Sequence, residues 1–355
     1  MPMTLRETAP AAGEQSRAKN QITKAVTRRL MILGGRANPA LTTAIAHRLG
    51  IEPMEREIKD HANGEPSIML DETVRGAELW IIQPTSLDPL RSHFELCAMI
   101  QTATIAGAAE ITVVLPSCMG ERQDRKKHGR EPITAALVFS QILSAGNVRR
   151  VLTLDLHSAQ LQCLVADRPA DHFYATDPMT AWMRTNWLDT NGGDDLVIVS
   201  PDIGGTGRAR AFGSRLGRRV AIINKTRSPN GEVETTDLIG DVNGKTAAIV
   251  DDMIDTAGTL CAGARFLLND CGAKRVVAAA TYPLLSDPAV ERLVASPIDQ
   301  IVVSDALHIP QEKIDALGER LAIVSVVPLL AEAIRRQFFD EECSDMIGWF
   351  HRASP

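Results

Sequence analysis

The sequence predicts an α/β protein with two tandem domains, each built on a mostly parallel sheet that is flanked by helices. Short apolar runs alternate with longer amphipathic stretches along most of the chain, which is the pattern of βαβ units. The chain has 355 residues, 45% of them hydrophobic, which is enough to form the cores of two ordinary domains. Carboxylates and glycines follow several of the apolar runs, where ligands bind in open α/β sheets.

Eight short apolar runs are expected to be strands, because each is bounded by polar or turn-forming residues. They are residues 30–33, 79–82, 111–115, 151–154, 196–199, 220–223, 247–250 and 276–280. Three of the stretches between them have helical spacing of apolar residues, and these are residues 93–106, 133–143 and 260–269. The alternation of the two patterns predicts parallel strands with crossover helices.

The predicted organisation is a mobile extension at residues 1–29, a domain at 30–176, a second domain at 177–340 and a tail at 341–355. Residues 1–29 are polar and lack apolar periodicity. An organellar transit peptide is the alternative, although Glu7 and Glu14 are unusual in such acid-poor segments. We expect the crossover between the domains at residues 167–178.

The composition excludes several classes of partner. A net charge of −6 and an aromatic content of 4% argue against a nucleic-acid surface, which needs a basic face and stacking rings. Because no stretch approaches 18 uninterrupted apolar residues, we expect no membrane span. The six cysteines are scattered without a CxxC motif, which suits a reducing cytoplasm. The partner should therefore be a small molecule.

Residues 246–259, TAAIVDDMIDTAGT, predict a sugar-phosphate site. Asp251 and Asp252 follow the apolar run, where carboxylates can accept hydrogen bonds from the vicinal hydroxyls of a ribose. The turn into the next helix directs backbone N–H groups and hydroxyls at one point, which suits a phosphate. This turn consists of Asp255, Thr256, Ala257, Gly258 and Thr259. The alternative is a solvated acidic turn.

Residues 151–157, VLTLDLH, end a predicted strand on Asp155 and His157. A histidine at this place can bind a metal or a phosphate, although a packed or solvated side chain is the common alternative.

Residues 196–210, LVIVSPDIGGTGRAR, repeat the arrangement of a strand followed by a loop. Asp202 offers the hard oxygen ligands that Mg²⁺ prefers, and Arg208 can neutralise phosphate oxygens. The glycines behind Asp202 let backbone N–H groups approach a diphosphate, and they are Gly204, Gly205 and Gly207.

Two charged segments complete the pattern. Residues 224–231, NKTRSPNG, contain nothing apolar to bury and predict a mobile lid, on which Lys225 and Arg227 can project to the same side. A solvated basic loop is the alternative. Residues 121–132, ERQDRKKHGREP, are strongly charged and precede a predicted helix, which is typical of a solvated surface.

These motifs together resemble those of the ribose-phosphate diphosphokinase family, from about residue 31 to about residue 337. The resemblance implies a type I phosphoribosyltransferase fold and transfer of the diphosphoryl group of Mg-ATP to the C1 hydroxyl of ribose 5-phosphate. It implies Mg²⁺ as cofactor, ATP and ribose 5-phosphate as substrates, and a homo-oligomer based on dimers, with hexamers usual in the family.

The resemblance also implies roles for individual residues. His157, Lys225 and Arg227 would be catalytic, with His157 and Asp202 also near the metal. The ribose 5-phosphate would be bound by Arg227 and by the DDMIDTAGT segment, from Asp251 to Thr259. The nucleotide would contact Arg122 and Gln123 of the Arg-Gln-Asp segment. It would also contact a turn that reaches adenine across a subunit boundary, formed by Asn63, Gly64 and Glu65.

Departures from the family's pattern lie mostly at the nucleotide end. Asn63 stands where Asp is usual, and SCMGE replaces a Pro-Tyr pair before Arg122. Val327 and Pro328 replace small hydroxyl-bearing residues, which predicts weakened or altered allostery. Three alternatives therefore stay open: a non-catalytic regulatory member, a paralogue with another nucleotide preference, and a phosphoribosyltransferase that consumes the product.

Overall fold

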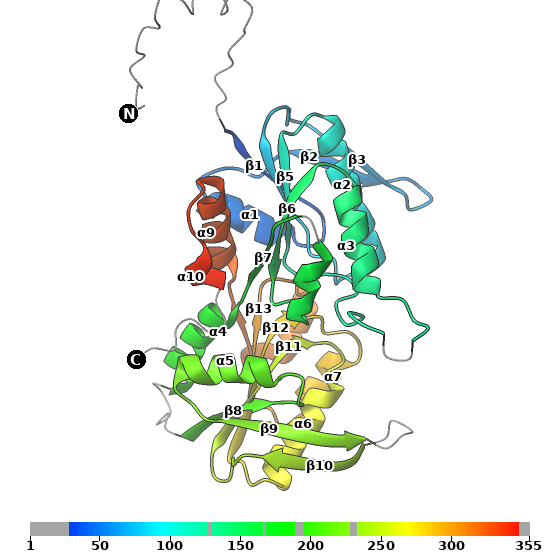
Figure 1. Ribbon diagram of the computed structural model, residues 1–355. Coiled ribbons are helices and arrows are strands. Elements are labelled where there is room, and N and C mark those ends of the chain that lie inside the picture. The colour runs from blue at the N-terminus through cyan, green and yellow to red at the C-terminus, as the bar shows by residue number, and fades with distance from the viewer. Residues whose placement is uncertain (1–27, 127–128, 166–167, 189–194, 228–232, 348–355) are drawn as a thin grey trace, which may run out of the picture.

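The computed structural model describes residues 28–126, 129–165, 168–188, 195–227 and 233–347 (Figure 1). Within them, two separate sheets carry the fold, and the α/β class predicted from the sequence is confirmed. Residues 1–27 of the predicted extension and 348–355 of the predicted tail lie outside the described residues. The domain boundaries proposed above stay a prediction.

The first sheet has five strands in the order β1-β4-β5-β6-β7, and all neighbours are parallel. Its interior strands are apolar along almost their whole length because helices or loops cover both faces. The strands are β1 (Leu30–Gly34), β4 (Glu78–Ile82), β5 (Glu110–Leu115), β6 (Val148–Leu154) and β7 (Ala170–Phe173).

The second sheet has seven strands in the order β10-β9-β8-β11-β12-β13-β14, of which only the pair β9 and β10 is antiparallel. β11 therefore lies at the centre, between β8 and β12. The strands are β8 (Leu196–Ser200), β9 (Val220–Arg227), β10 (Val233–Ile239), β11 (Thr246–Ile254), β12 (Arg275–Pro283), β13 (Gln300–Ser304) and β14 (Leu321–Val324).

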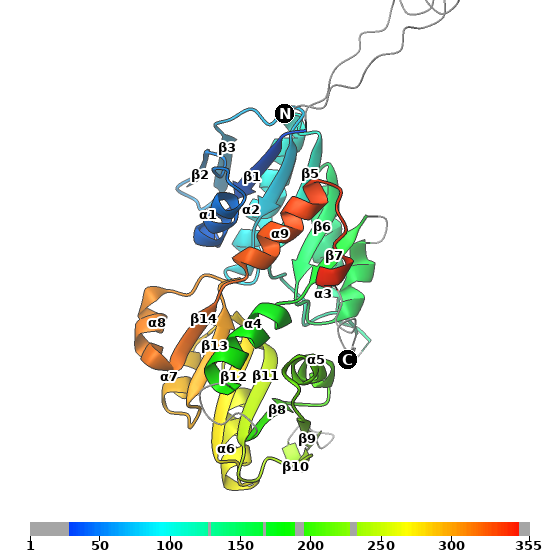
Figure 2. The same cartoon turned by 90° about the vertical axis from the view of Figure 1, so that its left-hand side faces the viewer.

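Helices flank both sheets (Figure 1). They are α1 (Pro39–Arg48), α2 (Pro89–Ile105), α3 (Thr134–Ser144), α4 (Thr176–Met183), α5 (Thr206–Leu216), α6 (Gly258–Asn269), α7 (Ala289–Val294), α8 (Gln311–Leu317), α9 (Val327–Phe338) and α10 (Ser344–Ile347). Figure 2 shows α9, from near the end of the chain, beside the first sheet, and it contacts α1. No helix in the described ranges is long and apolar enough to cross a membrane.

One apolar core joins the two sheets. It contains Phe173 beside β6, Tyr282 at the end of β12 and Leu330 of α9, each no more than 2% exposed. Two further clusters fill the outer side of each sheet separately. Because the shared core spans both halves of the chain, the carboxyl ends of the two sheets are held against each other.

All eight predicted strands and all three predicted helices are confirmed, with ends shifted by a few residues. The prediction that residues 224–227 belong to a loop is wrong, because β9 continues to Arg227 and Lys225 pairs with Thr236 of β10. The rest of the predicted lid, residues 228–231, lies outside the described residues. A two-stranded hairpin of β2 (Arg56–Asp60) and β3 (Pro66–Leu70) was not predicted.

Candidate active site

The segment predicted to bind a sugar phosphate lies at the end of the central strand of the second sheet. The pairing of β11 with β8 ends at Ile249, whereas Asp251 still pairs with Ala280 of β12. The two carboxylates therefore emerge where one neighbouring strand has stopped, which opens the sheet to a ligand.

The predicted phosphate turn connects β11 to α6. Ala257 has a φ of 58°, a left-handed conformation that few non-glycine residues adopt, and α6 starts at Gly258. The first backbone N–H groups of α6 have no partner within the helix, so they can bind an anion at this end. The turn predicted to bind phosphate thus lies at a helix N-terminus.

Asp252 connects the two sheets through His157. His157 Nδ1 lies 2.6 Å from Asp252 Oδ2, and the Asp252 side chain is almost fully buried. Arg208 Nη1 of α5 lies 3.9 Å from the other oxygen, Asp252 Oδ1. His157 follows β6 of the first sheet, so residues 95 positions apart meet at one point.

The charges of this cluster shift the pKa values of its members in opposite directions. The hydrogen bond to Asp252 raises the pKa of His157. Burial opposes ionisation of Asp252, but the hydrogen bond from His157 and the charge of Arg208 lower the pKa of Asp252. Burial and the adjacent Asp252 charge raise the pKa of Asp251. Neighbouring carboxylates with strongly perturbed pKa values are typical of functional sites.

Asp155, the other polar residue of the DLH segment, is engaged in holding the two sheets together. Its carboxylate accepts hydrogen bonds from Ala175 N at 3.0 Å and from Thr281 Oγ1 of β12 at 2.6 Å. Because the side chain is only 2% exposed, Asp155 is a structural residue behind the site.

Glu121 is a site residue that the sequence did not predict. Its carboxylate is 4% exposed and accepts hydrogen bonds from the backbone N–H groups of Cys118 and His157, the latter at 3.0 Å. Burial raises its pKa to about 7. The interpretation of residues 121–132 as a solvated face is therefore wrong for Glu121.

Arg122 extends from the first half of the chain to the phosphate turn of the second half. Arg122 Nη1 lies 2.6 Å from Asp255 Oδ2. Gln123 accepts a hydrogen bond from Thr134 at the start of α3. The segment predicted to bind nucleotide is thus in contact with the segment predicted to bind sugar phosphate.

A cavity of about 530 Å³ lies between the two sheets and brings these residues together. Its polar lining includes residues predicted to act on substrates or metal, among them His157, Asp202, Asp251 and Asp252. Further lining residues come from the glycine loop and from the first half of the chain: Gly204, Gly205, Gly207, Arg208, Arg122, Gln160 and Tyr174.

The donors in this cavity fit a magnesium ion that also binds substrate. No group of three or more acidic, histidine or cysteine side chains among the described residues forms a complete metal cage. His157 and Asp202 nevertheless line the same cavity, and Asp202 Oδ1 accepts a hydrogen bond from Gly205 N at 2.9 Å. Mg²⁺ usually keeps waters and substrate phosphates in its shell, so one or two protein ligands are sufficient.

Two groups of predicted residues are placed elsewhere. Asn63, Gly64 and Glu65 form the exposed tip of the β2–β3 hairpin and do not line the cavity (Figure 1). The backbones of Lys225 and Arg227 lie near the end of β9, and their side chains are outside what the structure describes.

The fold defines a protein of the phosphoribosyltransferase type, in which a second parallel sheet faces the loop predicted to bind a sugar phosphate. Residues 30–146 match a family model described as the N-terminal domain of ribose phosphate pyrophosphokinase. Residues 230–348 match a model described as a phosphoribosyl synthetase-associated domain.

Known proteins resemble the chain over nearly its full length. A ribose-phosphate pyrophosphokinase of Parasynechococcus marenigrum (strain WH8102) is 42% identical over 334 residues, covering 93% of this chain and 97% of that protein. The chloroplastic ribose-phosphate pyrophosphokinase 1 of Arabidopsis thaliana is 38% identical, covering 98% and 84%. The crystal structure of phosphoribosylpyrophosphate synthetase from Mycobacterium smegmatis superposes with a TM-score of 0.81 at 36% identity, covering 88% and 99%. The chain belongs to the ribose-phosphate pyrophosphokinase family.

Proposed function

We propose that the protein transfers the diphosphoryl group of ATP to the C1 hydroxyl of ribose 5-phosphate, giving 5-phosphoribosyl 1-diphosphate and AMP. The observation that carries this proposal is the contact between His157 of the first sheet and Asp252 of the second, inside the cavity that Asp202 also lines. Family membership supports the same reaction.

The acceptor sugar is bound by the end of β11 and by the loop that follows it. Asp251 and Asp252 accept hydrogen bonds from the ribose hydroxyls, and the turn from Asp255 to Thr259 binds the 5-phosphate. The anomeric hydroxyl then attacks the β-phosphorus of ATP in line, and AMP leaves. Positioning of the two substrates supplies much of the rate enhancement, because little covalent chemistry falls to the protein.

Bound Mg²⁺ would neutralise the phosphate oxygens of ATP and the charge that develops during transfer. His157 and Asp202 would hold it. Lys225 and Arg227 stabilise the charge on the transferring group and on the departing AMP phosphate, and Arg227 also contacts ribose 5-phosphate. Their position at the end of a hairpin allows them to close over the site.

The nucleotide lies on the side of Arg122 and Gln123. Asn63, Gly64 and Glu65 do not line the cavity of their own chain, which is consistent with their contacting a nucleotide bound by another copy in a homo-oligomer. We place the protein in the cytoplasm, since all six cysteines are free, as expected in a reducing compartment.

Phosphorus NMR of the product mixture tests the reaction. With ATP, Mg²⁺ and ribose 5-phosphate, the proposal predicts equal amounts of AMP and of a sugar bearing a diphosphate on C1. Formation of ADP in place of AMP would contradict diphosphoryl transfer. Loss of the diphosphate product on addition of a free base would indicate a phosphoribosyltransferase, and an unchanged mixture would favour a regulatory subunit.

A further inference from the structure

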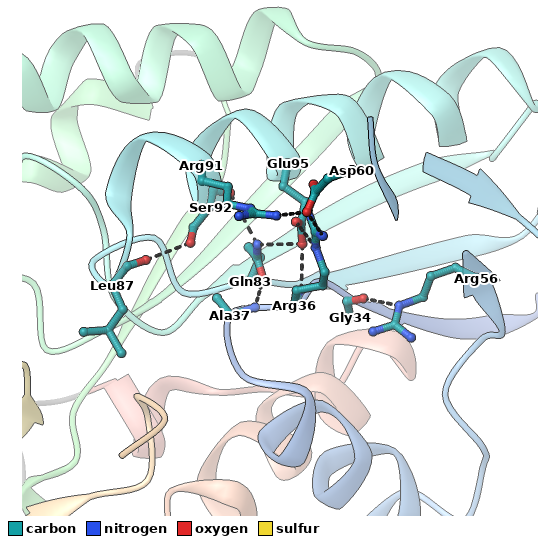
Figure 3. Close-up of polar contacts among 10 residues, drawn as sticks. All are labelled: Gly34, Arg36, Ala37, Arg56, Asp60, Gln83, Leu87, Arg91, Ser92 and Glu95. Atoms are coloured by element: carbon teal, nitrogen blue, oxygen red, sulfur yellow. Dashed lines mark hydrogen bonds and ion pairs between the residues drawn. The ribbon is translucent and has the colours of Figure 1, made fainter. Parts of the chain in front are cut away.

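The β2–β3 hairpin is a separate two-stranded sheet whose tip carries the residues proposed to contact nucleotide. Asp60, the last residue of β2, attaches the tip end of this hairpin to the body of the molecule (Figure 3). Its two oxygens each lie 3.0 Å from the guanidinium of Arg36, in a paired geometry, and one of them also contacts Arg91 of α2. Paired arginine–carboxylate contacts constrain orientation as well as distance.

Arg36 is itself held by a buried acid. Its Nε lies 2.8 Å from Glu95 Oε2, and its backbone N–H donates to Glu95 Oε1 at 2.6 Å. Glu95 is 1% exposed and accepts a further hydrogen bond from Gln83 Nε2 at 3.2 Å. The cluster of Arg36, Asp60, Arg91 and Glu95 therefore connects the hairpin to the β1–α1 loop and to α2.

The turn that follows Asp60 is internally bonded, so it moves with Asp60 as a unit. His61 N donates to Glu65 O at 2.8 Å, and Gly64 N donates to His61 O at 2.8 Å. Asn63 Oδ1 accepts a hydrogen bond from Glu65 N at 3.2 Å. The orientation of the whole turn thus depends on where Asp60 is held.

The middle and the opposite end of the hairpin have independent attachments. Arg56 Nε donates to Gly34 O at 2.6 Å, and Ile58 and Ile68 pack against the core of the first sheet. Removing the Asp60 contacts should therefore leave the hairpin folded and attached, while the orientation of its tip becomes less restricted.

We propose that the cluster of Arg36, Asp60, Arg91 and Glu95 positions the turn at residues 63–65 for nucleotide binding, with Asp60 as the positioning residue. The inference rests on the proposed function, since it assumes that this turn contacts the nucleotide. It predicts an effect on ATP and none on ribose 5-phosphate, because the hydrogen bonds and ion pairs of Asp60 go to Arg36 and Arg91 and not to the β11–α6 loop.

Steady-state kinetics of the full-length Asp60→Asn variant tests the inference. If the turn is correctly oriented in about a fifth of molecules without the cluster, the apparent KM for ATP rises about fivefold. The kcat, the KM for ribose 5-phosphate and the thermal midpoint should stay close to wild type. Asp60→Glu, which keeps the charge, should restore part of the affinity. Glu57→Gln is the matched control, because Glu57 lies on the same strand as Asp60. Among the ion pairs of the described residues, Glu57 pairs only with Lys59 of its own strand.

A wild-type KM for ATP in Asp60→Asn would overturn the inference. Equal rises in the KM values of both substrates, or a fall in kcat, would also overturn it, because they indicate a general structural role. Glu65→Ala separates this failure from failure of the proposed nucleotide turn. If Glu65→Ala raises the KM for ATP and Asp60→Asn does not, only the positioning role is wrong. If Asp60→Asn does not fold, Arg91→Gln removes one of the two partners and should raise the KM for ATP in the same direction.

Discussion

The buried carboxylate of Glu121 provides a quantitative test of the site's electrostatics. Its pKa is raised by burial from 4.5 to about 7, which corresponds to a penalty on the charged form of roughly 3 kcal/mol. The folded-state pKa of Glu121 lies above its unfolded value, so the folded protein is most stable when Glu121 is protonated, below pH 4.5. The free energy of unfolding falls as the pH rises from there through about 7. A glutamine at this position has the same shape and does not titrate.

The free energy of unfolding of metal-free Glu121→Gln, relative to wild type, should therefore increase with pH by up to roughly 3 kcal/mol between acidic and mildly alkaline solution. Urea unfolding of both proteins at a series of pH values measures this difference. Glu121→Ala should show the same slope but lie lower by about 1–3 kcal/mol, because the N–H groups of Cys118 and His157 lose their acceptor. Parallel curves for wild type and Glu121→Gln would refute the reasoning.

Two further substitutions probe the same region. The pKa of Asp251 is raised by burial and by the Asp252 charge, so Asp251→Asn should be more stable than wild type, with a gain that grows as the pH rises above 3.8. It should also lose roughly a hundredfold in activity, since one oxygen that accepts from the ribose hydroxyls becomes an amide nitrogen, which only donates; thermal melts at several pH values and turnover measurements check both. Tyr282→Phe should lower the free energy of unfolding by about 1–2 kcal/mol, because the Tyr282 hydroxyl donates to Leu154 O of the first sheet; an unchanged melting temperature would show that this contact does not stabilise the shared core.

The sequence was sufficient to predict the strands that are buried on both faces. Parallel strands such as β5 and β11 are covered by helices or loops, so they appear as continuous apolar runs. The β2–β3 hairpin gave no such signal, because β2 is largely polar and both strands are only partly buried. The end of β9 was missed because it pairs with β10 beyond the residues of β9 that pair with β8, and the sequence there is polar.

The candidate site was predictable only as a set of strand ends. Asp202, Asp251 and His157 each follow an apolar run, and parallel strands place such residues at one edge of a sheet. Which residues of the first sheet meet those of the second depends on the core that joins them, and no local pattern contains this information. Glu121 was missed because it belongs to a charged run, and such runs are usually solvated, whereas Glu121 is buried.

Release of AMP from ATP and Mg²⁺, with and without ribose 5-phosphate, tests the central claim most directly. Lys225→Ala provides the test of the proposed catalytic cation, and Lys245→Ala is the control, because Lys245 pairs with Asp241 on the turn before β11 and does not line the cavity. The account predicts AMP only when ribose 5-phosphate is present, a rate lower by at least about a hundredfold in Lys225→Ala, and a near wild-type rate in Lys245→Ala. AMP formation that does not depend on ribose 5-phosphate, or equal rates in the two variants, would contradict it.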